Sequence, residues 1–218
     1  MKWIIIYGAS GHGKVIADII EKSGGEVFGF VDDDQSKWGK LYIGYKILGG
    51  EEQLAKMCHP GDGGGNIAVI IGVGDNWTRK RIQERLAKKN TRFGTAVHPS
   101  AQIGKGVTVG EGTVIMANAV INPDTRIGCH CIINTAVTVD HDNSIGDFVH
   151  ISPGAHLGGG VTVGDLTWIG LGASVINNLH IAENSIVGAG AVVIRDVEAN
   201  SVVVGNPAGF LRKNQLGE

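Results

Sequence analysis

Three consecutive polar residues, Asp140-His141-Asp142, form the group best suited to acid–base chemistry in this chain. An ordinary histidine titrates near about pH 6.5, so its ring can accept a proton at neutral pH. A neighbouring carboxylate orients such a ring and raises its basicity. His141 is therefore a candidate general base, with Asp142 as its support. The alternative is a surface histidine between two solvated carboxylates, and Asp140 would compete with Asp142 for the ring.

The element that must position this group is a six-residue repeat from Ile103 to Glu198. It contains sixteen uninterrupted blocks, and the fifth place of each is mostly small or β-branched. A period of six fits neither a helix nor a single strand, and it indicates a β-solenoid. An ordinary β-sandwich would not keep this register over so many residues. Each block opens with an aliphatic residue: Ile103, Val109, Ile115, Ile121, Ile127, Ile133, Val139, Ile145, Ile151, Leu157, Val163, Ile169, Val175, Ile181, Val187 and Val193.

We expect these openers to point into the solenoid and to stack on one another, so that the blocks share one core. Gly often follows the opener, as in Ile103-Gly104 and Ile127-Gly128. We expect this glycine to adopt the backbone angles that a corner requires.

The residues before the repeat have the pattern of an α/β domain. Lys2–Tyr7 reads as a buried strand, a glycine-rich turn and a helix follow, and Glu26–Val31 reads as a second strand that ends in Asp32-Asp33-Asp34. This βαβ unit is Rossmann-like, and ligands of such folds bind at the carboxyl ends of the strands. Further elements are predicted at 51–57 (helix), 61–66 (glycine-rich loop), 67–71 (strand), 77–89 (helix) and 93–97 (strand). The sequence thus predicts domains at 1–97 and 98–218.

The glycine-rich turn from Gly8 to Lys14 resembles two nucleotide-binding motifs without matching either. Val15 stands where a P-loop has the hydroxyl that binds Mg²⁺, which argues against phosphate cleavage. The glycines at 8, 11 and 13 do not follow the dinucleotide pattern. A nicotinamide cofactor stays open because Asp32 and Asp33 could bind a ribose. A tight structural turn is the remaining alternative.

Composition excludes several classes of protein. The 218 residues carry a net charge of −2 without a basic run, so we expect no nucleic-acid partner. The apolar runs are too short to span a bilayer, so we expect no membrane insertion. No signal peptide is evident, and the three cysteines form no CxxC pair. We interpret Cys58, Cys129 and Cys131 as reduced thiols of a cytoplasmic protein.

The repeat resembles the hexapeptide acyltransferases, which form a left-handed parallel β-helix with three blocks per coil and are usually trimers. Sixteen blocks would then make about five coils. Four further segments extend the resemblance over nearly the entire chain: Tyr7–Gly13, Val31-Asp32-Asp33, Ile71–Asn76 and His98-Pro99-Ser100. Together they resemble the bacterial sugar acetyltransferases of sialic acid, bacillosamine and perosamine pathways.

This resemblance implies roles for individual residues. His141 and Asp142 match the family's catalytic His followed by an acidic residue, and Asn134 would bind the amine or the histidine. In the first domain, the resemblance assigns Ser10, Gly11 and His12 to the sugar and phosphates, Asp32 and Asp33 to the uridine end, and Gly74 to a close backbone contact. Acetyl-coenzyme A would contact His150 and the backbone at Leu171 and Ala189.

The expected activity is acetyl transfer from acetyl-coenzyme A to a nucleotide-linked 4-amino sugar, with UDP as the expected nucleotide, by a homotrimer that serves glycan biosynthesis. O-Acetylation of sialic acid or another sugar is the alternative, and a non-catalytic scaffold that binds sugar nucleotides is a further one. Since γ-type carbonic anhydrases share this solenoid, His141, His150 and His156 are candidate zinc ligands. Their spacing does not suit that site, so no metal is expected.

Overall fold

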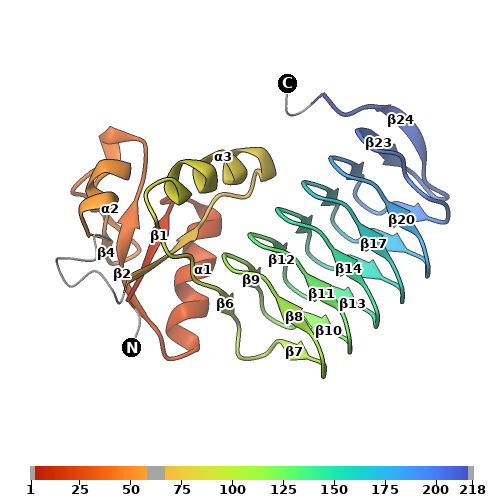
Figure 1. Ribbon diagram of the computed structural model, residues 1–218, viewed down its shortest axis with the longest axis horizontal. Helices are drawn as coiled ribbons and strands as arrows, with labels where there is room; N and C mark the ends of the chain where they lie inside the picture. Colours follow the sequence, from red (N-terminus) through yellow and green to blue (C-terminus); the bar gives the residue numbers. More distant parts are fainter. Residues whose placement is uncertain (1–2, 58–66, 216–218) are drawn as a thin grey trace. The chain divides into compact units, whose positions relative to one another are not determined.

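The computed structural model describes residues 3–57 and 67–215, which form two compact units, Met1–Pro99 and Ser100–Glu218 (Figure 1). The division falls close to the predicted boundary at residue 97. Cys58 and the predicted loop at 61–66 lie outside the described residues. Cys129 and Cys131 form no disulfide with any cysteine that the structure describes.

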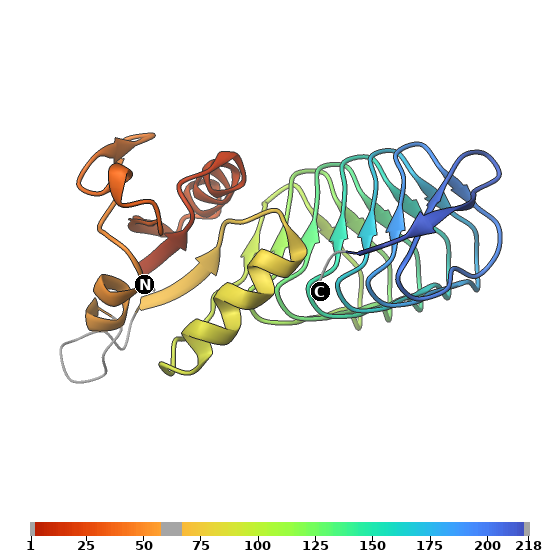
Figure 2. The same ribbon diagram turned by 90° about the horizontal axis from the view of Figure 1, so that it is seen from above.

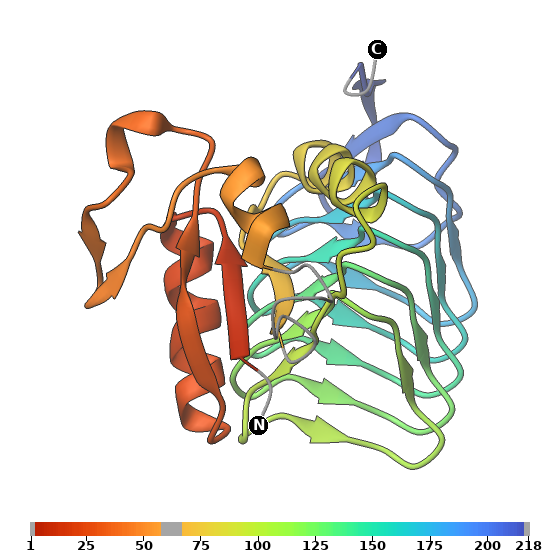
Figure 3. The same cartoon turned by 60° about the vertical axis from the view of Figure 1, so that its left-hand side comes forward.

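The first unit is built on a three-stranded parallel sheet in the order β2-β1-β5, comprising β1 (Trp3–Tyr7), β2 (Glu26–Val31) and β5 (Ile67–Ile71). One face packs against α2 (Glu51–Met57) and α3 (Asn76–Ala87) through Ile5, Leu54 and Ile82. The opposite face, with Phe30, packs against α1 (Gly11–Lys22), and α1 and α2 lie on either side of the sheet in Figure 3. The α/β character read from the sequence is therefore confirmed.

The connection after β2 contains elements that the sequence did not predict. A 3₁₀ turn, η1 (Gln35–Lys37), leads into a hairpin of β3 (Leu41–Tyr42) and β4 (Tyr45–Lys46). The last predicted strand is shorter than expected. Only β6 (Ala96–Val97) is regular, while Phe93 forms a single bridge to Val69.

The second unit is a parallel β-helix whose two-residue strands fall on three faces. One face contains β7 (Gln102–Ile103), β10 (Val120–Ile121), β13 (Thr138–Val139), β16 (His156–Leu157), β19 (Ser174–Val175) and β22 (Val192–Val193). The next contains β8 (Thr108–Val109), β11 (Arg126–Ile127), β14 (Ser144–Ile145), β17 (Thr162–Val163) and β20 (His180–Ile181). The third contains β9 (Val114–Ile115), β12 (Ile132–Ile133), β15 (His150–Ile151), β18 (Trp168–Ile169) and β21 (Ile186–Val187).

The coils repeat every 18 residues, since Val120 pairs with Thr138 and Ile132 with His150. Figure 2 shows the stacked coils from above. The β-helix continues beyond the predicted repeat, since β23 (Ser201–Val204) pairs in parallel with β21. The chain then reverses, and β24 (Gly209–Lys213) pairs antiparallel with β23. This extension gives about six coils where the sequence suggested about five. The predicted fold class, an α/β domain followed by a left-handed β-helix, is confirmed.

The core of the solenoid is made by the block openers. From Ile115 to Val193 every opener is buried, whereas Ile103 in the first coil is 43% exposed. Fifth-place hydroxyls are buried too, and each bonds to a carbonyl of the next coil, as Thr113 does to Gly128 O at 2.8 Å. Polar side chains are thus tolerated inside the solenoid because they satisfy backbone groups.

The role predicted for the glycines after the openers is wrong. The left-handed backbone conformation occurs at the fourth place of the block, where Gly106, Asp124 and Asp142 have φ of 77°, 62° and 58°. Glycine follows the opener because the next coil is close: a Cβ on Gly104 would lie 2.6 Å from Pro123 N. At that place the constraint is therefore the contact between coils, and not a backbone angle.

Among the described residues, no helix has both the length and the apolar character needed to cross a bilayer.

Candidate active site

His141 lies at the corner between β13 and β14, with its side chain 58% exposed. Its Nδ1 donates to Asp142 Oδ2 at 2.7 Å, which leaves Nε2 of the neutral ring free to accept a proton. This bond, followed by the negative charge of Asp140, raises the pKa of His141 above its ordinary value. The predicted pair is therefore in contact, and the second ring nitrogen of His141 remains on the exposed side chain.

Asp140 does not compete for the ring. Its Oδ1 accepts from Asn122 Nδ2 of the preceding coil at 2.7 Å and from the backbone N–H of His141 at 2.9 Å. The bond from Asn122 is the main cause of the lowered pKa of Asp140, so this carboxylate stays charged at neutral pH. Asp140 thus holds the corner that carries His141, a role that the sequence did not reveal.

The wall against the ring comes from the next coil. Gly159 is buried, and a Cβ added to it would lie 2.8 Å from Cε1 and Nε2 of His141. Gly160 N donates to His141 O at 3.0 Å. The sequence shows these residues only as part of a glycine run, so their contact with the ring was not predicted.

His150 lies on the third face, where its ring stacks on Trp168 with a centroid distance of 5.4 Å and an interplanar angle of 7°. Asn134 Nδ2 donates to His150 Nε2 at 3.1 Å, so the predicted partner of the substrate amine contacts His150 here. Trp168 is fixed in turn by a 2.7 Å bond from Nε1 to Ser152 Oγ. Trp168 was not singled out in the sequence, because an aromatic residue on a strand usually serves packing.

A shallow apolar groove of about 200 Å³ lies at the corner that follows the third face. Trp168, Leu171 and Ala189 line it, and the side chain of Leu171 is 59% exposed. Among the described residues, no carbonyl accepts from the backbone N–H of Leu171 or of Ala189. The groove therefore combines an apolar surface with backbone donors, which suits an extended ligand that contains amides.

The groove and His141 occupy different corners of the solenoid. His141 follows a strand of the first face, whereas Leu171 and Ala189 follow strands of the third face. One chain therefore does not bring these predicted site residues together.

In the first unit, Ser10 caps α1. Its Oγ donates to Gly72 O at 2.7 Å and accepts from Gly13 N at 3.3 Å. Gly11 and the half-buried His12 form the first turn of the helix. A Cβ built on Gly11 or on Gly74 would meet none of the described residues within 4 Å apart from the adjoining backbone. The start of α1 therefore presents backbone N–H groups at the carboxyl end of β1, a place suited to phosphate.

The two predicted acidic residues differ in their surroundings. Asp32 is buried and accepts from Ala9 N, Asp34 N and Lys37 Nζ, each at 2.9 Å, so its carboxylate is engaged within the protein. Asp33 is exposed and accepts from Tyr7 and from Arg85 Nη2, the latter at 3.0 Å.

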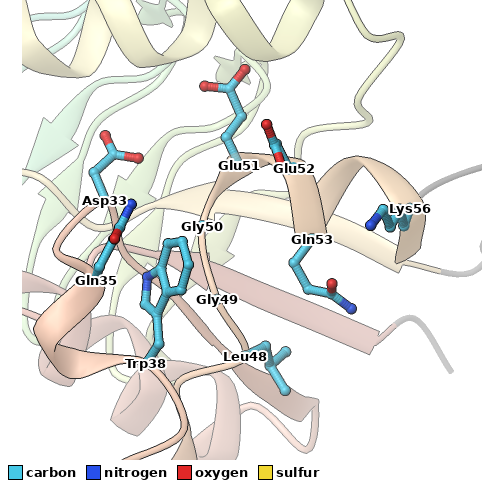
Figure 4. Close-up of a pocket in the computed structure, with 10 residues that line it drawn as sticks. All are labelled: Asp33, Gln35, Trp38, Leu48, Gly49, Gly50, Glu51, Glu52, Gln53 and Lys56. Carbon is cyan, nitrogen blue, oxygen red and sulfur yellow. The ribbon is translucent and has the colours of Figure 1, made fainter.

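Asp33 also lines a cavity of about 410 Å³. Trp38 and Gln35 lie side by side on one wall, and Gln53 and Lys56 of α2 lie on another (Figure 4). Trp38 is 42% exposed, and its Nε1 donates to Asp32 O at 2.7 Å, so a flat apolar surface is held at the cavity. This wall is not evident in the sequence, because it depends on the unpredicted 3₁₀ turn.

The described residues contain no group of three or more His, Cys, Asp or Glu that could hold a metal ion. His156, weighed above as a zinc ligand, bonds instead to Thr138 Oγ1 through Nδ1 at 2.8 Å.

Comparisons with known proteins agree with this architecture. Residues 3–86 match the PglD N-terminal domain. PerB from Caulobacter crescentus, solved in complex with CoA and GDP-perosamine, is 33% identical, with a TM-score of 0.89 over 97% of this chain and 98% of that one. The chain belongs to the bacterial sugar acetyltransferase family.

Two other members of the family are similar to this chain. The acetyltransferase domain of PglB from Neisseria gonorrhoeae is 33% identical, with a TM-score of 0.87 over 97% of this chain and all of that one. A second structure of that domain contains acetyl coenzyme A. UDP-N-acetylbacillosamine N-acetyltransferase of Bacillus subtilis is 40% identical over 126 residues, a match that spans about half of that protein (52%).

Proposed function

We propose that this protein transfers the acetyl group of acetyl-coenzyme A to the amino group of a nucleotide-linked 4-amino sugar. The observation that carries the proposal is the exposed His141, whose Nδ1 is held by Asp142 at 2.7 Å, in a chain similar over its whole length to a structure with CoA and GDP-perosamine. The UDP-linked sugar stays the expected substrate, since the relative from B. subtilis is named for a UDP sugar. GDP and dTDP sugars are the alternatives.

In the proposed reaction, the neutral sugar amine attacks the thioester carbonyl directly. A C–N bond forms, the C–S bond breaks, and His141 Nε2 takes the proton that the amine loses. Asp142 stabilises the resulting imidazolium. The thiolate that leaves is protonated to coenzyme A. Backbone N–H groups would stabilise the oxyanion that develops on the carbonyl.

We assign the apolar groove to acetyl-coenzyme A. The exposed Leu171 and Ala189 offer apolar contacts, and their backbone N–H groups could meet the pantetheine amides. His150, stacked on Trp168 and bonded to Asn134, would contact the coenzyme near its thioester. Asn134 would then reach the substrate amine from the same edge.

We assign the nucleotide to the first unit. The N-terminus of α1, with Ser10, Gly11 and His12, suits the diphosphate because its N–H groups and dipole favour negative charge. The open space at Gly74 would allow close approach of the ligand. The base would occupy the cavity beside Asp33, with the indole of Trp38 as a stacking surface. Asp32 would hold the loop in place.

We also propose that the active enzyme is a homotrimer. His141 and the apolar groove lie at different corners of one chain. A complete site therefore requires His141 of one subunit to meet the groove of its neighbour. The cytoplasm is the proposed location, because the co-substrate acetyl-coenzyme A is available there.

The pH dependence of the reaction provides a test of the base. Because the pKa of His141 is raised, kcat/KM should fall as the pH drops through a value above that of ordinary histidine. Asp142→Asn removes the main cause of this shift, so the acid limb should move to lower pH while the maximal rate falls. A pH profile of both proteins measures this, and an unmoved acid limb would contradict the assignment.

The function itself is tested by coenzyme A thiol release with UDP-, GDP- and dTDP-linked 4-amino sugars and with sialic acid. We expect fast release with one nucleotide-linked amine, and binding of its free nucleotide by calorimetry. Release with sialic acid alone would identify an O-acetyltransferase. Sugar-nucleotide binding without thiol release would favour a scaffold.

A further inference from the structure

Asn143 is an unusual residue for its place in the repeat. It occupies the fifth place of the block Val139–Ser144, and it is the only amide at any fifth place from Val107 to Val197. Its side chain is 1% exposed. A polar amide buried at this depth needs hydrogen-bond partners, because an unsatisfied one is costly.

The partners of the Asn143 side-chain NH₂ group are all backbone carbonyls near His141, whereas Oδ1 has no hydrogen-bond partner among the described residues. Its Nδ2 donates to Asp140 O at 2.7 Å, to Gly158 O at 3.0 Å and to His141 O at 3.2 Å. The first and third of these carbonyls belong to the peptide units on either side of His141. The second belongs to the next coil, immediately before the glycine that lies against the imidazole.

These contacts matter because little else holds the ring. The side chain of His141 is 58% exposed, so packing restrains it on one side only. Its direction depends on the backbone of the corner, on the bond to Asp142 and on the wall at Gly159. Asp142 adopts a left-handed φ of 58°, a conformation that neighbouring bonds must hold in place.

We infer that Asn143 is a positioning residue for His141. Its side chain joins the corner that carries the ring, through Asp140 O and His141 O, to the corner of the next coil that lies against the ring, through Gly158 O. Asn143 is not a catalytic residue, since it is buried beneath the corner and acts through His141. The inference rests on the proposed role of His141 as the base. It explains why an amide replaces the small or β-branched residues of other blocks: valine has no donor, and a threonine hydroxyl has only one proton to donate.

The test compares Asn143→Val with Thr113→Val, a control that also loses a buried bond to a carbonyl but lies in an earlier coil. Both variants should lose thermal stability. Only Asn143→Val should lose kcat, by roughly 10- to 100-fold, because a small displacement of a catalytic group is enough to cause such a loss. The KM values for acetyl-coenzyme A and for the sugar nucleotide should stay close to wild type.

Two further readouts separate positioning from a structural role. Asn143→Thr should recover part of kcat. By the pattern of Thr125, whose hydroxyl donates to Asp140 O fifteen residues on at 2.8 Å, a threonine at position 143 can donate to Gly158 O. Asp140 O then keeps its bond from Thr125. The acid limb of the pH profile should move to lower pH in Asn143→Val, because a displaced ring loses part of its bond to Asp142 and lies farther from the charge of Asp140, which together raise the pKa of His141. The adjoining turn of the next coil, Gly158–Gly160, contains no ionisable side chain, and the turn of the preceding coil contains one, Asp124, below Asp142.

A double-mutant cycle decides the inference even if Asn143→Val folds poorly, because Asn143→Thr can replace it. In the His141→Ala background, either substitution should cause no further loss of the residual rate. Multiplicative losses, or a wild-type kcat and acid limb in Asn143→Val, would overturn the inference. If His141→Ala itself kept wild-type turnover, the proposed base would fail first, independently of Asn143.

Discussion

His141→Ala should lower kcat by roughly 10²–10⁴-fold, because it removes the general base from the transition state. The loss should fall on kcat more than on either KM, since the ring is placed to take a proton and not to bind the ground state. The fold should be unaffected, as the side chain is 58% exposed and bonds, within the part of the chain that the structure describes, to Asp142 alone. Steady-state thiol release and thermal melting measure both effects.

His156→Ala provides a matched control for this experiment. His156 is also an exposed histidine on the solenoid, and its Nδ1 bonds to the hydroxyl of Thr138 at 2.8 Å. This variant should keep wild-type kcat. A His141→Ala protein with wild-type turnover, or a His156→Ala protein with an equal loss, would show that His141 is not the base.

Gly159→Ala should lower kcat by roughly 10²-fold, because a displacement of about 1 Å is enough to disrupt a catalytic group. The added methyl group would lie 2.8 Å from Cε1 and Nε2 of His141, closer than any ordinary contact. The backbone of Gly159 does not lie in the left-handed region, so alanine fits its conformation. The exposed imidazole is the group that must move, and the melting temperature should therefore change little.

The control for this variant is Gly209→Ala in β24, where a new Cβ has no atom within 4 Å. It should be as active as wild type. The acid limb of Gly159→Ala should also shift to lower pH, since a displaced ring loses its bond to Asp142. An active Gly159→Ala protein would show that Gly159 does not restrain the ring.

The sequence alone determined the parts of this protein that depend on short-range order. The six-residue period predicted the solenoid and the buried openers because each block repeats one strand and one corner. The bounds of β2, α2 and β5 agree with the predicted elements at Glu26–Val31, 51–57 and 67–71. His141 and Asp142 could be paired in advance because they are neighbours in the chain.

Tertiary structure decided what depends on the distance between coils. Asp140 meets Asn122 across 18 residues, and Gly159 supports the ring from the next coil. The six-residue period shows that such residues stack. It does not show which side-chain atoms meet, because that depends on the exact backbone conformation of each corner. In the first unit, Arg85 and Trp38 likewise lie near Asp33 although they come from separate elements, so only the tertiary structure brings them together.

The misassigned glycines illustrate this difference. A glycine after an opener and a glycine at the fourth place look alike in sequence, yet Gly104 is needed for a close contact and Gly106 for a φ of 77°. The separation of His141 from the apolar groove likewise follows from the three-sided coil. Local periodicity determines that a coil forms, while the contacts made between stacked coils determine which residues share a corner and which role each one has.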